Sequence, residues 1–543
     1  MQLTLFNDMN DTPIVARLGE ITIIKQQMTI RVCCPNDGRQ WESLMLGYAY
    51  KIESDKENYL LAPDSVSDRG RTIDITSIID LESFPFRSTH WQVRAVFRQD
   101  EKLYGARVVM EPEKQDMWDF LFHPNHYVTK DKHIVFPYTS REGYAGIRYR
   151  VASEADSFKT RIRECRALSR YKKHKEKYDA ENILLIYEKK CEKAQDNGFY
   201  FFKYCMDNDM ESYLGRKIYY VITADSVDRK KLKPYEDHVI PFLSMKHMTS
   251  LLACRALISP DARAHSYIWQ FDKSMIAGKI NKKPHVFLGH GVLALKRLND
   301  SFLAKNMNSI MTTVTSDAEA DIVVNELGFR RHAAAITGYS RFDALEDISD
   351  QYNEILIMPT HRSWLFGVER DVFLASEYFQ RYMELINSQE FIRMLKKHGM
   401  KAKFYLHPSI REHVSAFTSS DESVEVVQYG KYSLDELMMR CKLLITDYSS
   451  ICWDVYYMGK PVLFYQYDLK EYLDTWGSYI DLKKDSPGKR AEDFEQLIER
   501  IREAMDQDFA LDEVWAARQS DYFRYVDTEN SRRICEALKE RGI

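Results

Sequence analysis

The chain is poor in glycine and proline, with 21 and 15 of its 543 residues. This excludes collagen-like and low-complexity architectures. No run approaches the roughly 18 uninterrupted apolar residues of a membrane span, so none is predicted. There is also no excess of positive charge, because 77 Lys and Arg stand against 81 Asp and Glu, a formal net charge of −4. We therefore expect a globular protein that does not bind nucleic acid.

The cysteines show no recognisable spacing. There are nine, an odd number, with no Cys-x-x-Cys and only Cys33 and Cys34 adjacent. This usage is typical of a reducing compartment and predicts neither disulfides nor a metal site. A Gly-x-Gly-x-x-Gly motif and a Walker loop are also missing, which argues against the usual dinucleotide and ATP sites. We therefore expect no cofactor. The first twenty residues carry acidic side chains where a secretory signal needs basic ones, so we expect a cytoplasmic protein.

The pattern of residues 1–150 predicts an all-β accessory domain, with an architecture like a small sandwich. Short β-type runs alternate with turn signals, and the clearest is a hairpin. Its first strand alternates from Trp91 to Phe97, Arg98 to Lys102 form the turn, and the second strand runs back to Met110.

Residues 151–181 form a basic segment with helix-compatible spacing. Between Lys159 and Lys177 there are nine Lys or Arg and two Glu. One interpretation is a solvated helical linker. The other is a helix that lies on anionic lipid head groups or on a polyanionic substrate.

From residue 182 onward, continuous apolar runs alternate with helical stretches. Such a pattern predicts parallel sheets covered on both faces. We expect an α/β protein with two doubly wound domains, 182–345 and 346–543, and a site between them. Helices are expected at 370–397 and 493–505. The expected strands are 183–187, 218–223, 239–243, 256–258, 286–288, 355–358, 403–406, 443–446 and 461–465.

Ligands of doubly wound sheets bind beyond the carboxyl ends of the strands, so the residues that follow each run are candidates. His290 stands between two glycines and is placed as a general base; the alternative is a turn histidine held by backbone groups. The side chains of Arg362 and His407 suit phosphate contacts. The candidates fall in five clusters, 289–292 with Lys296 and Arg297, 337–343, 359–362, 407–408, and 447–450 with Asp454.

The fifth cluster opens a helix directly after a buried strand. Ser449 and Ser450 predict a phosphate-binding helix start, and the alternative is ordinary N-capping. Asp454 lies one helical turn further on. We expect its carboxylate to meet a ribose or polyol hydroxyl, or to orient a neighbouring cation.

Taken in this order, the clusters resemble the CDP-glycerol glycerophosphotransferase family, the teichoic acid polymerases. The resemblance covers about residues 180–535. It rests on these stretches: LGHGVLALKR, TGYSRFDAL, MPTHRSW, YLHPS, ITDYSSICWDVYYMGKPVLFYQYDLKEY and FRYVDTENSRRI.

The resemblance implies a GT-B fold, two Rossmann-like domains with an active site between them. It implies transfer of a polyol phosphate from CDP-glycerol or CDP-ribitol to the terminal hydroxyl of a growing polymer, with CMP released and no metal needed. The acceptor would be a lipid-linked polyol phosphate or glycan, and the enzyme would lie peripherally on the inner, anionic face of the cell membrane. The implied base is His290. Donor contacts are implied for Arg362, His407, Ser449, Ser450 and Asp454, with support from Lys296, Arg341, Thr360 and Asp447.

The sequence departs from the family pattern at two places. Leu288-Gly289 precede His290 where the family commonly has Trp or Gln, and His361 stands where it has Trp or Phe. Two alternatives stay open: a GT-B glycosyltransferase that uses a nucleotide sugar, and a polyanion-binding protein without catalysis.

Overall fold

The computed structural model describes residues 16–48, 58–99, 102–110, 117–122, 125–140, 142–267, 274–365 and 368–543. The chain divides into two compact units. The first comprises Met1–His174, Leu243–Leu252 and Tyr267–Asn281, and the second Lys175–Phe242, Ala253–Ser266 and Lys282–Ile543. Within the described part of the chain, no helix is both long enough and apolar enough to cross a membrane.

The first unit is built on a sheet of 11 strands, almost all of them antiparallel. The exception is a short parallel pairing of β1 with β8. The predicted hairpin is confirmed as β7 and β8, although Asp100 and Glu101 of its turn lie outside the described residues. The strands are β1 (Ala16–Ile24), β2 (Gln27–Pro35), β3 (Gln40–Tyr48), β4 (Tyr59–Leu61), β5 (Ser65–Asp68), β6 (Thr72–Asp80), β7 (His90–Gln99), β8 (Lys102–Val109), β9 (Tyr127–Val128), β10 (His133–Thr139) and β11 (Ala145–Val151).

One apolar core unites this sheet. Met28 of β2, Leu44 of β3, Ile75 of β6, Trp91 of β7 and Ile147 of β11 all belong to it. Since strands from separate parts of the sheet bury side chains together, the sheet folds over its own core. The unit also contains a short helix, α1 (Met117–Phe122). The arrangement as a sandwich stays a prediction.

The basic segment forms two helices, α2 (Phe158–Lys173) and α3 (Lys175–Ala180). Helix α2 packs within the first unit through a buried face that carries Glu164. This carboxylate accepts hydrogen bonds from Tyr267 Oη at 2.5 Å and Ser274 Oγ at 2.8 Å. Helix α2 is therefore anchored along one face. Its other face exposes Lys159, Arg166, Arg170, Lys172 and Lys173.

The second unit contains two parallel sheets. The seven-stranded sheet has the order β14-β13-β12-β15-β16-β17-β18, and the six-stranded sheet has the order β21-β20-β19-β22-β23-β24. In each, the first strand in the chain lies beside the fourth and the order reverses there, as in dinucleotide-binding folds. The strands are β12 (Ile183–Tyr187), β13 (Lys217–Ile222), β14 (Val239–Pro241), β15 (Ala256–Ser259), β16 (His285–Phe287), β17 (Ser309–Val314), β18 (Ala334–Ile336), β19 (Glu354–Ile357), β20 (Lys401–Phe404), β21 (Val424–Val426), β22 (Cys441–Thr446), β23 (Val462–Tyr465) and β24 (Lys489–Ala491).

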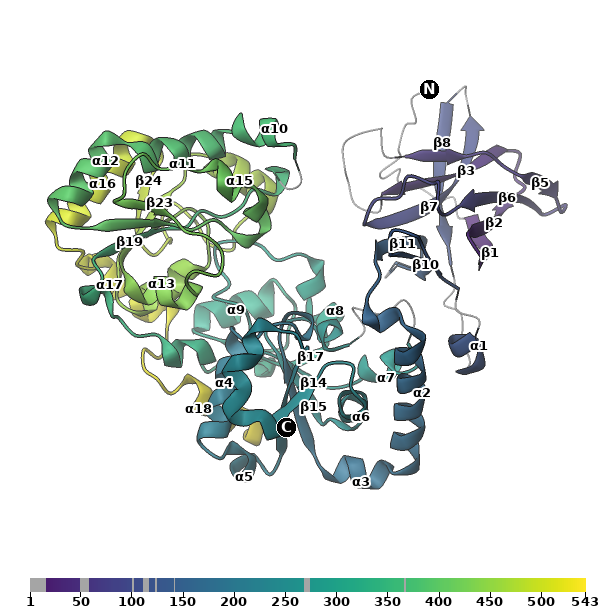
Figure 1. Ribbon diagram of the computed structural model, residues 1–543, viewed down its shortest axis with the longest axis horizontal. Coiled ribbons are helices and arrows are strands. Elements are labelled where there is room, and N and C mark those ends of the chain that lie inside the picture. Colours follow the sequence, from purple (N-terminus) through teal and green to yellow (C-terminus); the bar gives the residue numbers. More distant parts are fainter. Residues whose placement is uncertain are drawn as a thin grey trace. The chain divides into compact units, whose positions relative to one another are not determined.

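Helices cover both faces of the six-stranded sheet, because successive residues of β19 enter opposite cores. Ile355 and Ile357 pack with α11, α12 and α16, whereas Leu356 and Met358 pack with α13 and α14. Figure 1 shows α11, α12 and α16 on one side of β19 and α13 on the other. This arrangement confirms the predicted doubly wound α/β class. The helices of the second unit beyond α3 are α4 (Asn197–Asp207), α5 (Met210–Leu214), α8 (Ala304–Met307), α9 (Asp317–Asn325), α10 (Arg370–Leu374), α11 (Glu377–Asn387), α12 (Gln389–Lys397), α13 (Leu434–Arg440), α14 (Ile451–Tyr457), α15 (Leu469–Trp476), α16 (Phe494–Asp506), α17 (Glu513–Tyr522) and α18 (Asn530–Glu540).

The last helix, α18, packs against the seven-stranded sheet. Its residues Ile534, Cys535 and Leu538 share a core with Leu184 of β12 and Phe201 of α4. The chain's last segment thus stabilises the seven-stranded sheet, although it follows the six-stranded one in sequence. The predicted boundaries of the four domains stay a prediction.

Candidate active site

The loop after β16 presents His290 in a fixed conformation. Gly289 has a φ of +65°, and a Cβ at this position would lie 2.8 Å from the ring of Tyr339. Only glycine meets both conditions. The loop is held by Asn197 Nδ2, which donates to the Gly289 carbonyl at 2.8 Å, and by Tyr339 Oη, which donates to the Gly291 carbonyl at 3.0 Å. The backbone around His290 is therefore set by buried side chains from other elements.

The His290 ring lies between two carboxylates. Its Nδ1 is 2.9 Å from Asp196 Oδ2, and its Nε2 is 3.5 Å from Asp261 Oδ1. Burial works against the charged ring, but the hydrogen bonds and charges of Asp196 and Asp261 outweigh it and raise the pKa of His290 to about 10. Without a ligand, the ring is therefore an imidazolium at neutral pH.

Neither carboxylate was predicted from the sequence. Asp196 is the N-cap residue of α4, and Asp261 follows β15. The rule of examining residues beyond each strand could have found Asp261. Although burial opposes it, hydrogen bonds from His265 and His290 lower the pKa of Asp261, which keeps this carboxylate charged beside the ring.

Arg341 connects the His290 loop to α14 of the six-stranded sheet. Its Nε and Nη2 donate to the two carboxylate oxygens of Asp454 at 2.6 and 2.8 Å, and its Nη1 donates to the His290 carbonyl at 2.9 Å. Of the two roles predicted for Asp454, orienting a cation is the one that these contacts support. A bidentate pair of this kind fixes the guanidinium plane.

The serine pair lies at the start of α14. Ser450 takes the N-cap position, but its side chain makes no capping hydrogen bond. It lies instead beside the His290 loop, since a Cβ on Gly291 would be 3.4 Å from Ser450 Oγ. Ser450 is exposed and Ser449 is half-buried. The Ser450 hydroxyl therefore faces solvent and does not bond to the helix backbone.

Arg362 is enclosed, with 1% of its surface exposed. Its Nε and Nη2 donate to Asp468 at 2.6 and 3.1 Å, and its Nη1 donates to Asp447 at 2.8 Å and to the Thr360 carbonyl at 2.6 Å. Two carboxylates thus balance its charge. A phosphate contact by Arg362 stays a prediction, and it would require one of these partners to move. Asp468, which lies in the fifth of the six quoted stretches, was not singled out from the sequence.

Asp447 organises the ends of β19 and β22. It accepts hydrogen bonds from the backbone N–H of Thr360 at 2.8 Å and of Tyr448 at 2.6 Å, besides the bond from Arg362. The predicted supporting residues Thr360 and Asp447 are therefore in direct contact. Lys296 lies with its Nζ 3.2 Å from the centre of the Trp476 ring.

His407 begins the helical turn Pro408–Ala416, and its Nδ1 accepts from the Ser409 N–H at 3.2 Å. Burial, with further contributions from His361, Lys189 and Lys296, lowers the pKa of His407 to about 4. Lys189 also donates its backbone N–H to Asp261, the carboxylate beside His290, at 2.7 Å. The structure thus brings His290, Arg341, Ser450 and Asp454 together, and it also brings Thr360, Arg362 and Asp447 together, with His407 stacked on His361 beside them.

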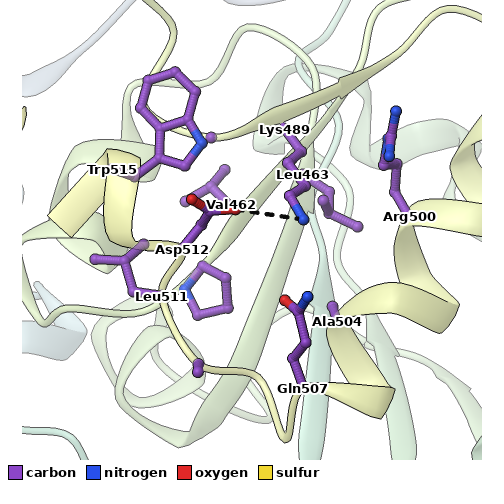
Figure 2. Close-up of a pocket in the computed structure, with 12 residues that line it drawn as sticks. Val462, Leu463, Lys489, Arg500, Ala504, Gln507, Leu511, Asp512 and Trp515 are labelled. Carbon is purple, nitrogen blue, oxygen red and sulfur yellow. Dashed lines mark ion pairs between the residues drawn. The ribbon is translucent and has the colours of Figure 1, made fainter.

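A separate pocket lies between β23, β24, α16 and α17. Figure 2 shows Val462, Lys489, Asp512 and Trp515 among its lining, with Lys489 Nζ 3.6 Å from Asp512 Oδ2. It contains none of the predicted site residues. We therefore place the site at the strand ends and not in this pocket.

Two doubly wound sheets with polar side chains at their switch points define a class of α/β protein that binds nucleotide-like ligands. The comparison with known families gives the particular assignment. The chain belongs to the family described as CDP-glycerol:poly(glycerophosphate) glycerophosphotransferase, whose model matches residues 169–540.

The chain is also similar to several proteins of known name. The minor teichoic acid biosynthesis protein GgaB of Bacillus subtilis (strain 168) is 30% identical over 365 residues, which are 64% of this chain and 39% of that protein. The teichoic acid ribitol-phosphate polymerase TarK of Staphylococcus aureus (strain NCTC 8325 / PS 47) is 24% identical over 251 residues, 42% of this chain and 45% of that protein. The chain thus spans less than half the length of these relatives. A solved structure of the wall teichoic acid polymerase TagF aligns with a TM-score of 0.47 at 16% identity, over 71% of this chain and 97% of that one.

Proposed function

We propose that this protein is a transferase that moves a polyol phosphate from a CDP-activated donor to a hydroxyl of a teichoic-acid-like or capsular polymer and releases CMP. Membership of the family over residues 169–540 supports the reaction class. The observation that carries the proposal is the histidine of the Gly-His-Gly loop, fixed at a strand end and oriented by Asp196 and Asp261.

The finer architecture that we propose is GT-B. The seven-stranded sheet would bind the acceptor, because it carries His290. The six-stranded sheet would bind the donor, because Ser449, Ser450 and His407 follow its strands. The strand orders of both sheets support this assignment. The six-stranded sheet reverses between β19 and β22, and Thr360, Ser449 and Ser450 follow these strands. The seven-stranded sheet reverses between β12 and β15, and His290 follows the neighbouring strand β16.

The proposed reaction is an in-line displacement at phosphorus. The acceptor hydroxyl oxygen forms a bond to the phosphorus that carries the polyol, the bond from that phosphorus to the CMP oxygen breaks, and the electron pair leaves with CMP. His290 takes the hydroxyl proton. Such a transfer depends on positioning and charge stabilisation more than on covalent catalysis.

The two carboxylates have opposite effects on the catalysis by His290. They stabilise the imidazolium that forms when the ring takes the proton, but they also hold a proton on the ring before substrate binds. Only the neutral ring can act as a base. The rate should therefore rise with pH until the ring of the free enzyme loses its proton.

Two features concern the partners. Glycerol and ribitol donors both fit the family motifs, and we propose CDP-glycerol first because the family description names it. The exposed basic face of α2 would hold the polyanionic acceptor or the inner face of the cell membrane, where anionic lipids attract Lys and Arg.

The test is release of CMP from CDP-glycerol and, in parallel, from CDP-ribitol, with a lipid-linked glycerol-phosphate acceptor. We expect release with one donor and its loss in His290→Ala. Release that survives this substitution would remove His290 from the mechanism. If folded protein with a competent acceptor releases CMP from neither donor, the proposal fails and the nucleotide-sugar alternative takes its place.

A further inference from the structure

His361 and His407 form an aromatic pair at the ends of β19 and β20. Their ring centroids are 4.4 Å apart, with 33° between the planes. Both rings are half-buried. Two imidazoles at this distance cannot both be charged without a counter-charge nearby, so an anion at this place would change their protonation.

Polar atoms around the pair lack partners. His361 Nδ1 and Thr360 Oγ1 are both buried and make no hydrogen bond in the structure. Buried polar atoms are normally satisfied, so these two neighbouring atoms are available to bond a ligand. An imidazole N–H and a hydroxyl are both donors that suit phosphate oxygens.

The charges that act on the two rings are mostly positive. Lys296 and Arg362 face His361, and Lys189 and Lys296 face His407. The one carboxylate that acts on His361 is Asp447, and it is already paired with Arg362. Since Asp447 and Asp468 balance Arg362, the excess of positive charge comes from Lys189 and Lys296, and it favours an anion over a neutral sugar or a cation.

We propose that His361 is a second imidazole, beside His407, in the subsite that takes the diphosphate of the nucleotide donor, and that binding there is coupled to uptake of a proton. This inference rests on the proposed function, which supplies the diphosphate.

The coupling follows from the protonation of the two rings. Burial, aided by Lys296 and Arg362, lowers the pKa of His361, and burial lowers that of His407 to about 4. Both rings are therefore neutral at neutral pH. An anion within hydrogen-bond reach favours the imidazolium, so binding raises the pKa of at least one ring and takes a proton from the solvent. The diphosphate diester of a CDP-polyol has no titrating group in this range, which assigns the proton to the protein.

Calorimetry of CDP-glycerol and CDP-ribitol binding tests this coupling. Titrations at about pH 6 and 8, in two buffers with different ionisation enthalpies, give the number of protons taken up. We expect uptake that is larger at the lower pH. In His361→Phe, which keeps an aromatic ring against His407, we expect roughly tenfold weaker binding and smaller uptake. His361→Gln keeps a donor without a titrating group and should reduce uptake with a smaller loss of affinity.

His398→Phe is the matched control, because His398 is exposed at the end of α12 and should change neither quantity. If a donor binds without proton uptake, or if His361→Phe binds and takes up protons like the unmodified protein, the inference is wrong and the proposed function stands. If neither donor binds, the proposed function fails. In that case sulfate, which does not titrate in this pH range, serves as the probe. Sulfate binding that is weaker in His361→Phe would support the anion subsite, and a lack of sulfate binding would exclude it.

Discussion

The substitution Asp196→Asn should lower the pKa of His290, because it removes the nearer of the two carboxylates without changing the shape of the side chain. The ion pair is 2.9 Å long and the histidine side chain is 41% exposed. An opposite charge at this distance shifts a pKa by about one to three units, and solvent reduces that effect for a partly exposed ring. We expect the pKa of His290, about 10 in the unmodified protein, to fall by roughly one to two units.

Two assays measure this shift independently. An NMR titration of the His290 ring gives the pKa without any assumption about activity. The pH dependence of CMP release should show its rise at a correspondingly lower pH in the variant. The sign for stability follows from linkage: a raised pKa stabilises the fold below about pH 6.5, and this contribution is lost as the pH rises through about 10. Asp196→Asn should reduce that pH dependence.

Asp225→Asn is the control for the loss of one negative charge, because Asp225 is exposed on the same unit. It should leave the titration of His290 unchanged. A pKa of His290 near 6.5 in the unmodified protein would refute the reasoning, as would a titration that Asp196→Asn does not move.

Three further predictions concern stability, each measured by denaturant unfolding. Arg362→Met should lower the free energy of unfolding by about 3–5 kcal/mol, because it leaves two buried carboxylates without their cation. An unchanged free energy of unfolding would mean that Arg362 is free to bind ligand. Gly289→Ala should lower the free energy of unfolding by about 1–3 kcal/mol, because its φ is positive and a Cβ would meet the Tyr339 ring. Gly278→Ala is the control and should be close to neutral, because a Cβ there meets nothing within 4 Å. Burial lowers the pKa of His285 to about 3, so the unfolded state binds more protons and stability should fall by about 1–2 kcal/mol between pH 7 and 5. His285→Gln should flatten that acid limb, and an identical slope would contradict the assignment.

Most strands of the two parallel sheets were predictable because they are continuous apolar runs. The predicted strand 183–187 coincides with β12, and the other eight overlap observed strands. Four were missed. β17 is a six-residue strand with Ser and Thr at three positions. The other three have three residues each, AAI in β18, VEV in β21 and KRA in β24, and contain no run of large apolar side chains.

The long helix predicted at 370–397 is three helices, α10 to α12. Helix α10 ends at Leu374, and Ser376 caps the start of α11; Ser388 ends α11 and caps α12. Each serine accepts a backbone N–H with its side chain. Serine is a strong N-cap residue, so the sequence contained this signal. The apolar periodicity continues across both breaks, because all three helices cover the same sheet, and it concealed them.

The site was predictable only in part. Reading the residues beyond strand ends located His290, His407 and Asp447, since topology alone places them. It could not supply Asp196, which comes from a helix start 94 residues before His290. Nor could it show that Arg362 is enclosed by carboxylates, because burial depends on packing that no local pattern encodes.

The nucleotide that leaves is the most direct test of the central claim. Attack on the phosphorus that carries the polyol releases CMP and forms a new phosphodiester, whereas glycosyl transfer from a nucleotide sugar releases a nucleoside diphosphate. We would follow the reaction by ³¹P NMR with CDP-glycerol or CDP-ribitol and a polyol-phosphate acceptor. The account predicts equal amounts of CMP and new phosphodiester, both lost in His290→Ala. Turnover only with a nucleotide sugar, with a nucleoside diphosphate as product, would contradict it.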